Sequence, residues 1–173
     1  MKKKVTLFLF LAVIFISPVQ PVSADVPVVT ESASVRREKV ESGYDYRVNL
    51  LETYFKGYNS PLADHAKHFI YFADKYGLDW RLVPAISGVE STFGKNIPTG
   101  SYNAYGWANG SYYFESWLNS IEIVSKTLRE KYIDRGANTL PKIARRYAAS
   151  PTWERKVRFF MNEIDRVPLA FTI

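Results

Sequence analysis

Glu90 is the side chain of this 173-residue chain whose position best suits acid–base chemistry. It stands near the end of an apolar segment, directly before a long irregular stretch rich in glycine, asparagine and serine. Its apolar neighbours Val89 and Phe93 would reduce the solvation of the carboxyl group. Desolvation favours the protonated form, which is the form that a general acid needs near neutral pH. The alternative interpretation is a glutamate that merely caps the helix or pairs with Lys95.

The other candidate constellation is a pair of histidines. His65 and His68 lie three residues apart on an expected helix and could share a metal ion, but no acid or third ligand completes a site. We therefore expect surface histidines. The sequence contains no cysteine, which excludes disulfides and thiolate metal sites. It also lacks a phosphate-binding glycine loop, so we expect neither a metal nor a cofactor.

The elements that must position Glu90 are helices. Apolar residues recur every three or four positions over six segments. These segments predict helices around residues 50–58, 61–76, 80–91, 117–132, 140–148 and 151–164. Asp79 is the expected cap of the third helix, and Pro84 should kink or delay its first turns. No strand pattern is visible, so the sequence predicts an all-α domain with one long functional loop, Phe93 to Ser111.

Two segments resemble a motif pair of lysozyme-like glycosidases of bacterial cell walls, and most of all of peptidoglycan N-acetylglucosaminidases. Those proteins carry Glu-Ser, any residue, an aromatic residue and Gly at the end of a buried helix. After a loop they carry Asn, any residue, an aromatic residue and Gly. This chain has Glu90–Gly94 (ESTFG) and Asn103–Gly106 (NAYG). Segments 114–121 and 147–157 are also similar, so the resemblance runs from Trp80 to Ile164 and implies a lysozyme-like fold.

The resemblance implies roles for seven residues. Glu90 would protonate the glycosidic oxygen of the leaving sugar. Tyr147 would lie near the scissile bond and steady positive charge at the anomeric carbon. The expected substrate-binding residues, which would line the groove or stack on sugar faces, are Ser91, Phe93, Asn103, Tyr105 and Trp107. The plainer interpretations are a core tyrosine at 147 and loop packing for the aromatic residues.

The chain departs from the family pattern after the second motif. Family members usually insert a small β-lobe there, which can supply a second carboxylate, whereas here only Trp107–Tyr113 precede the next helix. Glu115 is the nearest acid afterwards, although it also suits the first turn of that helix. With one carboxylate the substrate must take part, through its N-acetyl group or through the 6-hydroxyl of muramic acid. The second route is that of lytic transglycosylases, which remain the alternative within the same substrate class.

The N-terminus predicts export. Three lysines precede the apolar run Val5–Ile16, and small residues up to Ala24 suit a signal peptidase. The run is about a dozen residues, shorter than the roughly 20 that span a bilayer. We expect a signal peptide over residues 1–24, a flexible spacer over 25–46 and the glycosidase domain over 47–173. An uncleaved, slightly short anchor is the alternative.

The net positive charge limits the classes of partner that this protein is expected to bind. Loss of the three signal lysines lowers the formal charge from +6 to +3, and most of the remaining positive charge lies between Lys126 and Arg166. A basic face could be simply solvated or could bind nucleic acid, but outside the cytoplasm an anionic envelope polymer is the expected partner. The sequence thus predicts a secreted, cell-surface or periplasmic monomer. It would cleave peptidoglycan glycan strands, without nucleic acid and without stable membrane insertion after signal cleavage. The rival from another class is a non-catalytic wall-binding module.

Overall fold

The computed structural model describes residues 45–167, and every regular element in that range is helical. The predicted all-α class is therefore confirmed, with no strand among these residues. The predicted signal peptide (1–24) and nearly all of the predicted spacer (25–46) lie outside the described residues. None of the helices described is long and apolar enough to cross a membrane.

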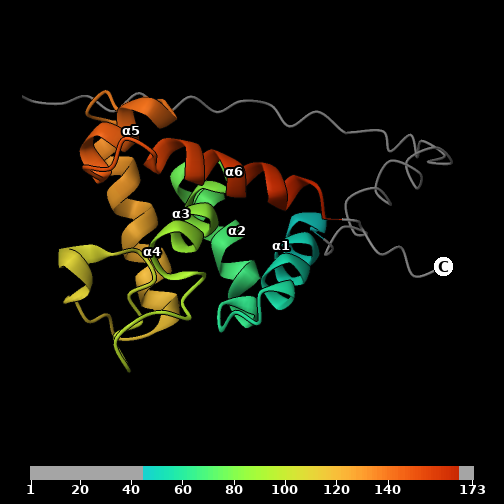
Figure 1. Ribbon diagram of the computed structural model, residues 1–173. Helices are drawn as coiled ribbons and strands as arrows, with labels where there is room; N and C mark the ends of the chain where they lie inside the picture. Colours follow the sequence, from blue (N-terminus) through green and yellow to red (C-terminus); the bar gives the residue numbers. More distant parts are fainter. Residues whose placement is uncertain (1–44, 168–173) are drawn as a thin grey trace, which may run out of the picture. The chain divides into compact units, whose positions relative to one another are not determined.

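Six α-helices, two 3-10 turns and one π-helical turn follow one another over the described range (Figure 1). In order they are α1 (Tyr46–Gly57), η1 (Ala63–His65), α2 (Ala66–Tyr76), α3 (Leu82–Ser91), η2 (Trp107–Gly110), α4 (Trp117–Thr127), the π-helical η3 (Leu128–Ile133), α5 (Leu140–Tyr147) and α6 (Trp153–Asp165). The expected long loop joins α3 to α4 and contains η2.

The third predicted helix begins later than the sequence suggested. Asp79 does accept a hydrogen bond from the backbone N–H of Arg81 (3.0 Å), but this closes a turn, and regular helix starts at Leu82 rather than at residue 80. Pro84 then falls in the first turn, where a backbone N–H has no partner within the helix. Of the two outcomes expected for Pro84, a kink or a delayed start, the structure shows the second, because regular helix begins only at Leu82.

The second predicted helix also begins later. Ser60 Oγ accepts the N–H of Leu62 (3.0 Å), as a capping residue should. The next bonds, however, join residues three apart, for example the N–H of His65 to the carbonyl of Leu62 (3.0 Å). The chain therefore forms the 3-10 turn η1 first, and α2 starts at Ala66.

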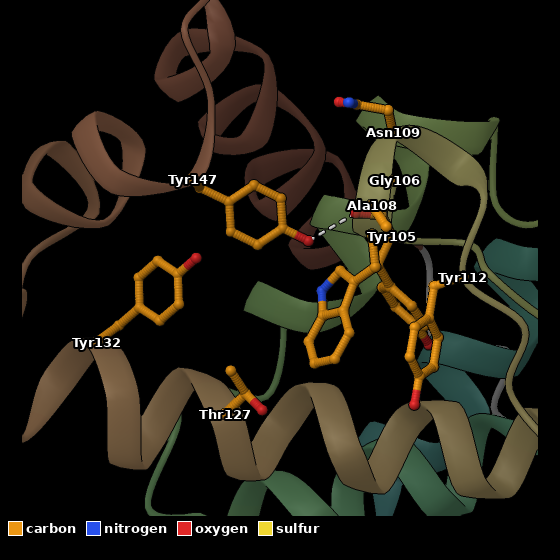
Figure 2. A pocket seen from close by; sticks show the side chains of 9 residues that line it. Tyr105, Gly106, Ala108, Asn109, Tyr112, Thr127, Tyr132 and Tyr147 are labelled. Carbon is orange, nitrogen blue, oxygen red and sulfur yellow. Dashed lines mark hydrogen bonds between the residues drawn. The ribbon is translucent and has the colours of Figure 1, made fainter.

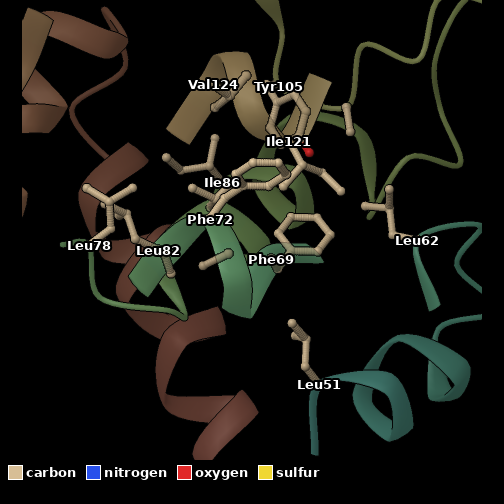
Figure 3. Close-up of a cluster of buried hydrophobic side chains, with 14 of the residues drawn as sticks. Leu51, Leu62, Phe69, Phe72, Leu78, Leu82, Ile86, Tyr105, Ile121 and Val124 are labelled. Atoms are coloured by element: carbon tan, nitrogen blue, oxygen red, sulfur yellow. The ribbon is translucent and has the colours of Figure 1, made fainter. Parts of the chain in front are cut away.

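α3 is the best-buried helix. All seven residues from Leu82 to Gly88 are buried, because α6 packs along one side of α3 while α2 and α4 contact others. Its neighbours contribute large apolar side chains to one core, including Leu51, Phe69, Phe72, Ile121 and Val124 (Figure 3). The last turn of α3, which carries Glu90, is consequently anchored by the core.

Candidate active site

The chain reverses directly after Glu90 through three left-handed residues. Thr92, Phe93 and Gly94 have φ values of 53°, 59° and 80°. This conformation costs a non-glycine residue about 1–2 kcal/mol. Burial offsets that cost, because the Phe93 ring is fully enclosed and lies 5.1 Å, centroid to centroid, from the ring of Phe160 on α6.

Two serine hydroxyls secure this turn. Ser91 Oγ accepts the N–H of Gly94 (2.8 Å) and lies 2.9 Å from the carbonyl oxygen of Ala104, to which it can donate. Ser60 Oγ donates to the carbonyl of Phe93 (2.7 Å). Ser91 and Phe93 are both buried. The structure therefore places these two residues, which the sequence predicted to bind substrate, as buried supports for Glu90.

Asn103 and Tyr105 are also supports. The amide nitrogen of Asn103 donates to the carbonyls of Trp107 (2.9 Å) and Tyr112 (3.0 Å), and its amide oxygen accepts the N–H of Trp107 (3.1 Å). Both N–H groups of the buried amide are therefore committed to the loop. The Tyr105 side chain is 0% exposed. The structure therefore places the side chains of Asn103 and Tyr105, which the sequence predicted to bind sugar, in the framework of the loop.

The loop held by Asn103 carries Gly106 against the carboxyl group of Glu90. Gly106 has φ 70°, and a Cβ at this position would lie 2.6 Å from Glu90 Oε2. From the other side, the indole N–H of Trp153 on α6 donates to Glu90 Oε1 (2.7 Å). Glu90 is half-buried, and Oε2 makes no hydrogen bond within residues 45–167. The carboxyl group is thus held by one oxygen and open at the other.

Tyr147 completes the surroundings of Glu90. Its ring stacks on Trp153, with centroids 4.8 Å apart and planes 25° apart, and its hydroxyl donates to the carbonyl of Tyr105 (2.8 Å). Burial is the main cause that raises the pKa of Tyr147 well above its usual value, and the nearby negative charge of Glu90 adds to it. A side-chain hydrogen bond from Trp107 lowers this pKa by a smaller amount. Tyr147 is therefore a neutral phenol at physiological pH.

A pocket of about 400 Å³ adjoins this group of residues (Figure 2). Figure 2 shows Tyr147 and Tyr132 on one side of the pocket and Tyr112 on the other, with the Gly106–Asn109 turn above. The full lining is Tyr105, Gly106, Trp107, Ala108, Asn109, Tyr112, Thr127, Tyr132 and Tyr147. Aromatic faces beside hydroxyl and amide groups can bind a ring that is apolar on its faces and hydroxylated at its edge.

The structure divides the predicted site residues into two groups. Glu90, Tyr147 and Trp107 lie at or beside the pocket, whereas Ser91, Phe93, Asn103 and the buried side chain of Tyr105 form the framework behind it, although Tyr105 also borders the pocket. Sequence reasoning missed Trp153 as the partner of Glu90 and Tyr132 as part of the pocket wall. Each lies on the helical face predicted to point inward, and this was the available signal.

The second carboxylate that the sequence left open is absent from the pocket wall. Glu115 is exposed and precedes Ser116, the cap of α4, so it does not lie in the first turn of that helix as expected. No acidic side chain occurs among the nine lining residues. Glu90, reached past Gly106, is the acid beside the pocket.

The histidine pair is the nearest approach to a metal site in the described part of the chain. The Nδ1 atoms of His65 and His68 lie 3.4 Å apart on η1 and α2. Among residues 45–167, no group of three or more potential ligands gathers.

Comparisons with known proteins assign no family. No family model matches the chain, and no curated protein matches it either. The resemblance to cell-wall glycosidases therefore depends on the motifs themselves, and the function has to be argued from the geometry of the site.

Proposed function

We propose that this chain is a peptidoglycan hydrolase that cleaves β-1,4 bonds between N-acetylglucosamine and N-acetylmuramic acid, with Glu90 as general acid. The setting of Glu90 carries the proposal. A carboxyl group on a buried helix is bonded at one oxygen and open at the other, beside an aromatic-lined pocket. The predicted export would deliver the enzyme to this substrate.

The hydrogen bond to Trp153 determines which oxygen would carry the proton. An indole N–H only donates, so Glu90 Oε1 must accept from it in both protonation states. In the neutral acid the proton is then favoured on Oε2, the oxygen that faces Gly106, because a protonated Oε1 would be the weaker acceptor for the indole N–H. Oε2 is therefore the atom that would protonate the glycosidic oxygen of the leaving sugar.

Tyr147 would act as a neutral neighbour of the reacting carbon. Its proton is directed to the carbonyl of Tyr105, so the phenolic oxygen can only accept from other groups, among them the Trp107 side chain. A neutral oxygen dipole can steady positive charge that develops at the anomeric carbon, as a transition state of oxocarbenium character requires.

Lytic transglycosylation is the second candidate, favoured by the lack of an acidic residue in the pocket wall. Hydrolysis with two carboxylates needs them about 5–9.5 Å apart across the bond. With Glu90 alone, the substrate has to supply the nucleophile. Attack by its N-acetyl group leads to hydrolysis, and attack by the 6-hydroxyl of muramic acid gives an anhydro ring.

The decisive experiment is mass spectrometry of the products after the mature domain is incubated with purified peptidoglycan. Products with a reducing N-acetylglucosamine end support the glucosaminidase assignment, and anhydromuramic ends support the transglycosylase. Glu90→Gln keeps the shape of the side chain and can still accept from Trp153. It should lower turnover by about 10²–10⁴-fold, the usual contribution of general acid catalysis.

Wall binding by Glu90→Gln separates the enzyme from a non-catalytic wall-binding module. The variant should sediment with peptidoglycan as well as the parent does, because the pocket residues supply the binding. A parent that binds the wall but releases no product would establish the binding module. A Glu90→Gln variant that digests as fast as the parent would remove Glu90 from the mechanism, and Glu115 would be tested next.

A further inference from the structure

A second hollow lies along the contact between α3 and α6. We call it the seam groove. It has a volume of about 470 Å³ and is lined by Gly88, Val89, Arg155, Lys156, Phe159 and Phe160. No acidic residue contributes to this lining. The groove therefore combines an apolar floor with positive charge.

The cations of the seam groove have no carboxylate partner among the residues that the structure describes. Neither Arg155 nor Lys156 forms an ion pair within residues 45–167, whereas Arg158 and Arg166 on the same helix pair with glutamates of α6, at 2.6 and 2.8 Å. Phe159, which lines the groove together with Arg155 and Lys156, is 54% exposed. Two unpaired cations beside an exposed ring fit a ligand that has carboxylates and short apolar groups.

The groove is close to the proposed catalytic acid. α3 and α6 run antiparallel, since Glu90 at the end of α3 bonds Trp153 at the start of α6, while Arg81, before α3, pairs with Asp165 at the end of α6. Lys156 is three residues after Trp153, a rise of about 4.5 Å along the helix. The groove thus begins within about one helical turn of the residue that holds Glu90.

We propose that the seam groove receives the peptide stem of an N-acetylmuramic acid next to the cleaved bond. This inference rests on the proposed function and names the part of the substrate that would be recognised. The stem carries carboxylates, which would meet Arg155 and Lys156, and alanine methyl groups, which would pack on Phe159. A glycan freed of stems by an amidase keeps the lactyl carboxylate at the sugar ring, but it offers the groove no stem carboxylate and no alanine methyl group.

The test compares two double variants of equal charge. Arg155→Gln with Lys156→Gln removes both groove cations, and Arg158→Gln with Arg166→Gln removes two cations of α6 that do not line the groove. The substrates are intact peptidoglycan and the same glycan freed of stems by an amidase. For the groove variant, kcat/KM on intact peptidoglycan should fall about three- to tenfold, with no change on the stem-free glycan. The control should match the parent on both.

Co-sedimentation of the same proteins gives a readout that does not need turnover. The parent should bind intact peptidoglycan more tightly than stem-free glycan, and the groove variant should lose this preference. Equal binding of the two materials by the parent would overturn the inference. A groove variant whose binding falls equally on intact peptidoglycan and on stem-free glycan would also overturn it. The same holds for a groove variant that loses binding only to phosphatidylglycerol vesicles, tested in the same assay. A stem preference without any product would support the groove while refuting the proposed hydrolase.

Discussion

Two turns flank Glu90. Both contain non-glycine residues with left-handed backbone, but one turn holds a fully buried residue of this kind, whereas in the other turn these residues are exposed. The rear turn (residues 92–94) contains left-handed Thr92 and Phe93, and the pocket turn (residues 106–110) contains left-handed Ala108 and Asn109. Phe93 is fully buried, whereas Ala108 and Asn109 are exposed. The conformational cost is therefore offset by core burial in the rear turn and by hydrogen bonds in the pocket turn.

The difference shows how one pair of motifs divides its work. The rear turn lines neither the pocket nor the seam groove, and it fixes the end of α3. The side chain of Asn103 holds the pocket turn through hydrogen bonds on one side, and the other side of the turn lines the pocket. Substitutions in the rear turn should consequently affect stability, and those in the pocket turn should affect activity or binding.

The rear turn should give the largest effect on stability. Phe93→Ala removes a fully buried ring and should lower the free energy of unfolding by about 3–5 kcal/mol. Tyr113→Ala, which removes an exposed ring, should change it by less than about 0.5 kcal/mol. Urea unfolding of both variants measures this. A loss below about 1 kcal/mol for Phe93→Ala would show that the rear turn does not depend on the core.

The pocket turn should give the largest effect on activity short of removing the acid. The Cβ of Gly106→Ala would displace the carboxyl group of Glu90, because the new atom would lie 2.6 Å from Oε2. A misplacement of about 1 Å can lower turnover about 100-fold. The stability loss should stay near 1 kcal/mol, since the side chain of Glu90 can move aside.

Gly110→Ala is the matched control for that prediction. Gly110 also has positive φ (86°), but a Cβ there meets no atom within 4 Å. This variant should lose a similar amount of stability and keep its activity on peptidoglycan. If both variants lost activity equally, the strain of the turn and not the contact with Glu90 would be responsible.

Much of the fold could be predicted from the sequence because it depends on local periodicity. The predicted segments all proved helical, and the end of α3 beside Glu90 was correctly placed. The starts of α2 and α3 were wrong because Ser60 and Asp79 close short turns before regular helix begins. Such turns and a helix start share the same capping residues, so the local sequence does not separate them.

The site could be predicted only in part, because a motif gives the order of residues and not the direction of side chains. Glu90 was identified by its place between a buried helix and a loop. Phe93 was expected in the groove, whereas its left-handed backbone turns the ring into the core. The bond from Trp153 to Glu90 joins residues 63 apart and exists only because α3 and α6 pack antiparallel. Local patterns contain no such information.

A smaller effect is expected from the aromatic wall of the pocket. Trp107 is half-buried and lines the pocket, so Trp107→Ala should weaken binding to peptidoglycan by about 1 kcal/mol, which is about fivefold. The fold should persist. Tyr46→Ala, which removes an exposed ring of α1 outside the pocket, should bind as the parent does. A Trp107→Ala protein that unfolds outright would place Trp107 in the core and not in the binding surface.

The smallest effect concerns the link between the pocket turn and α5. Tyr147→Phe keeps the stack on Trp153 but removes the bond to the carbonyl of Tyr105, which should lower the free energy of unfolding by about 0.5–1.5 kcal/mol at pH 7. Tyr113→Phe, at an exposed ring, serves as the control.

The pH dependence of that stability tests how far the hydroxyl of Tyr147, a half-buried residue that lines the pocket, is removed from water. Its pKa is raised in the folded state, mainly by burial, while an unfolded tyrosine titrates near pH 10. Its contribution is therefore complete below pH 10 and is lost as the pH rises from 10 towards the folded pKa, because the unfolded chain releases its proton first. Tyr54 and Tyr105, whose pKa values are also raised, contribute equally in parent and variant. Urea unfolding from pH 8 to 11 should thus show a shallower fall for Tyr147→Phe. Parallel curves would mean that water reaches the Tyr147 hydroxyl, and that the pocket turn is not closed against α5.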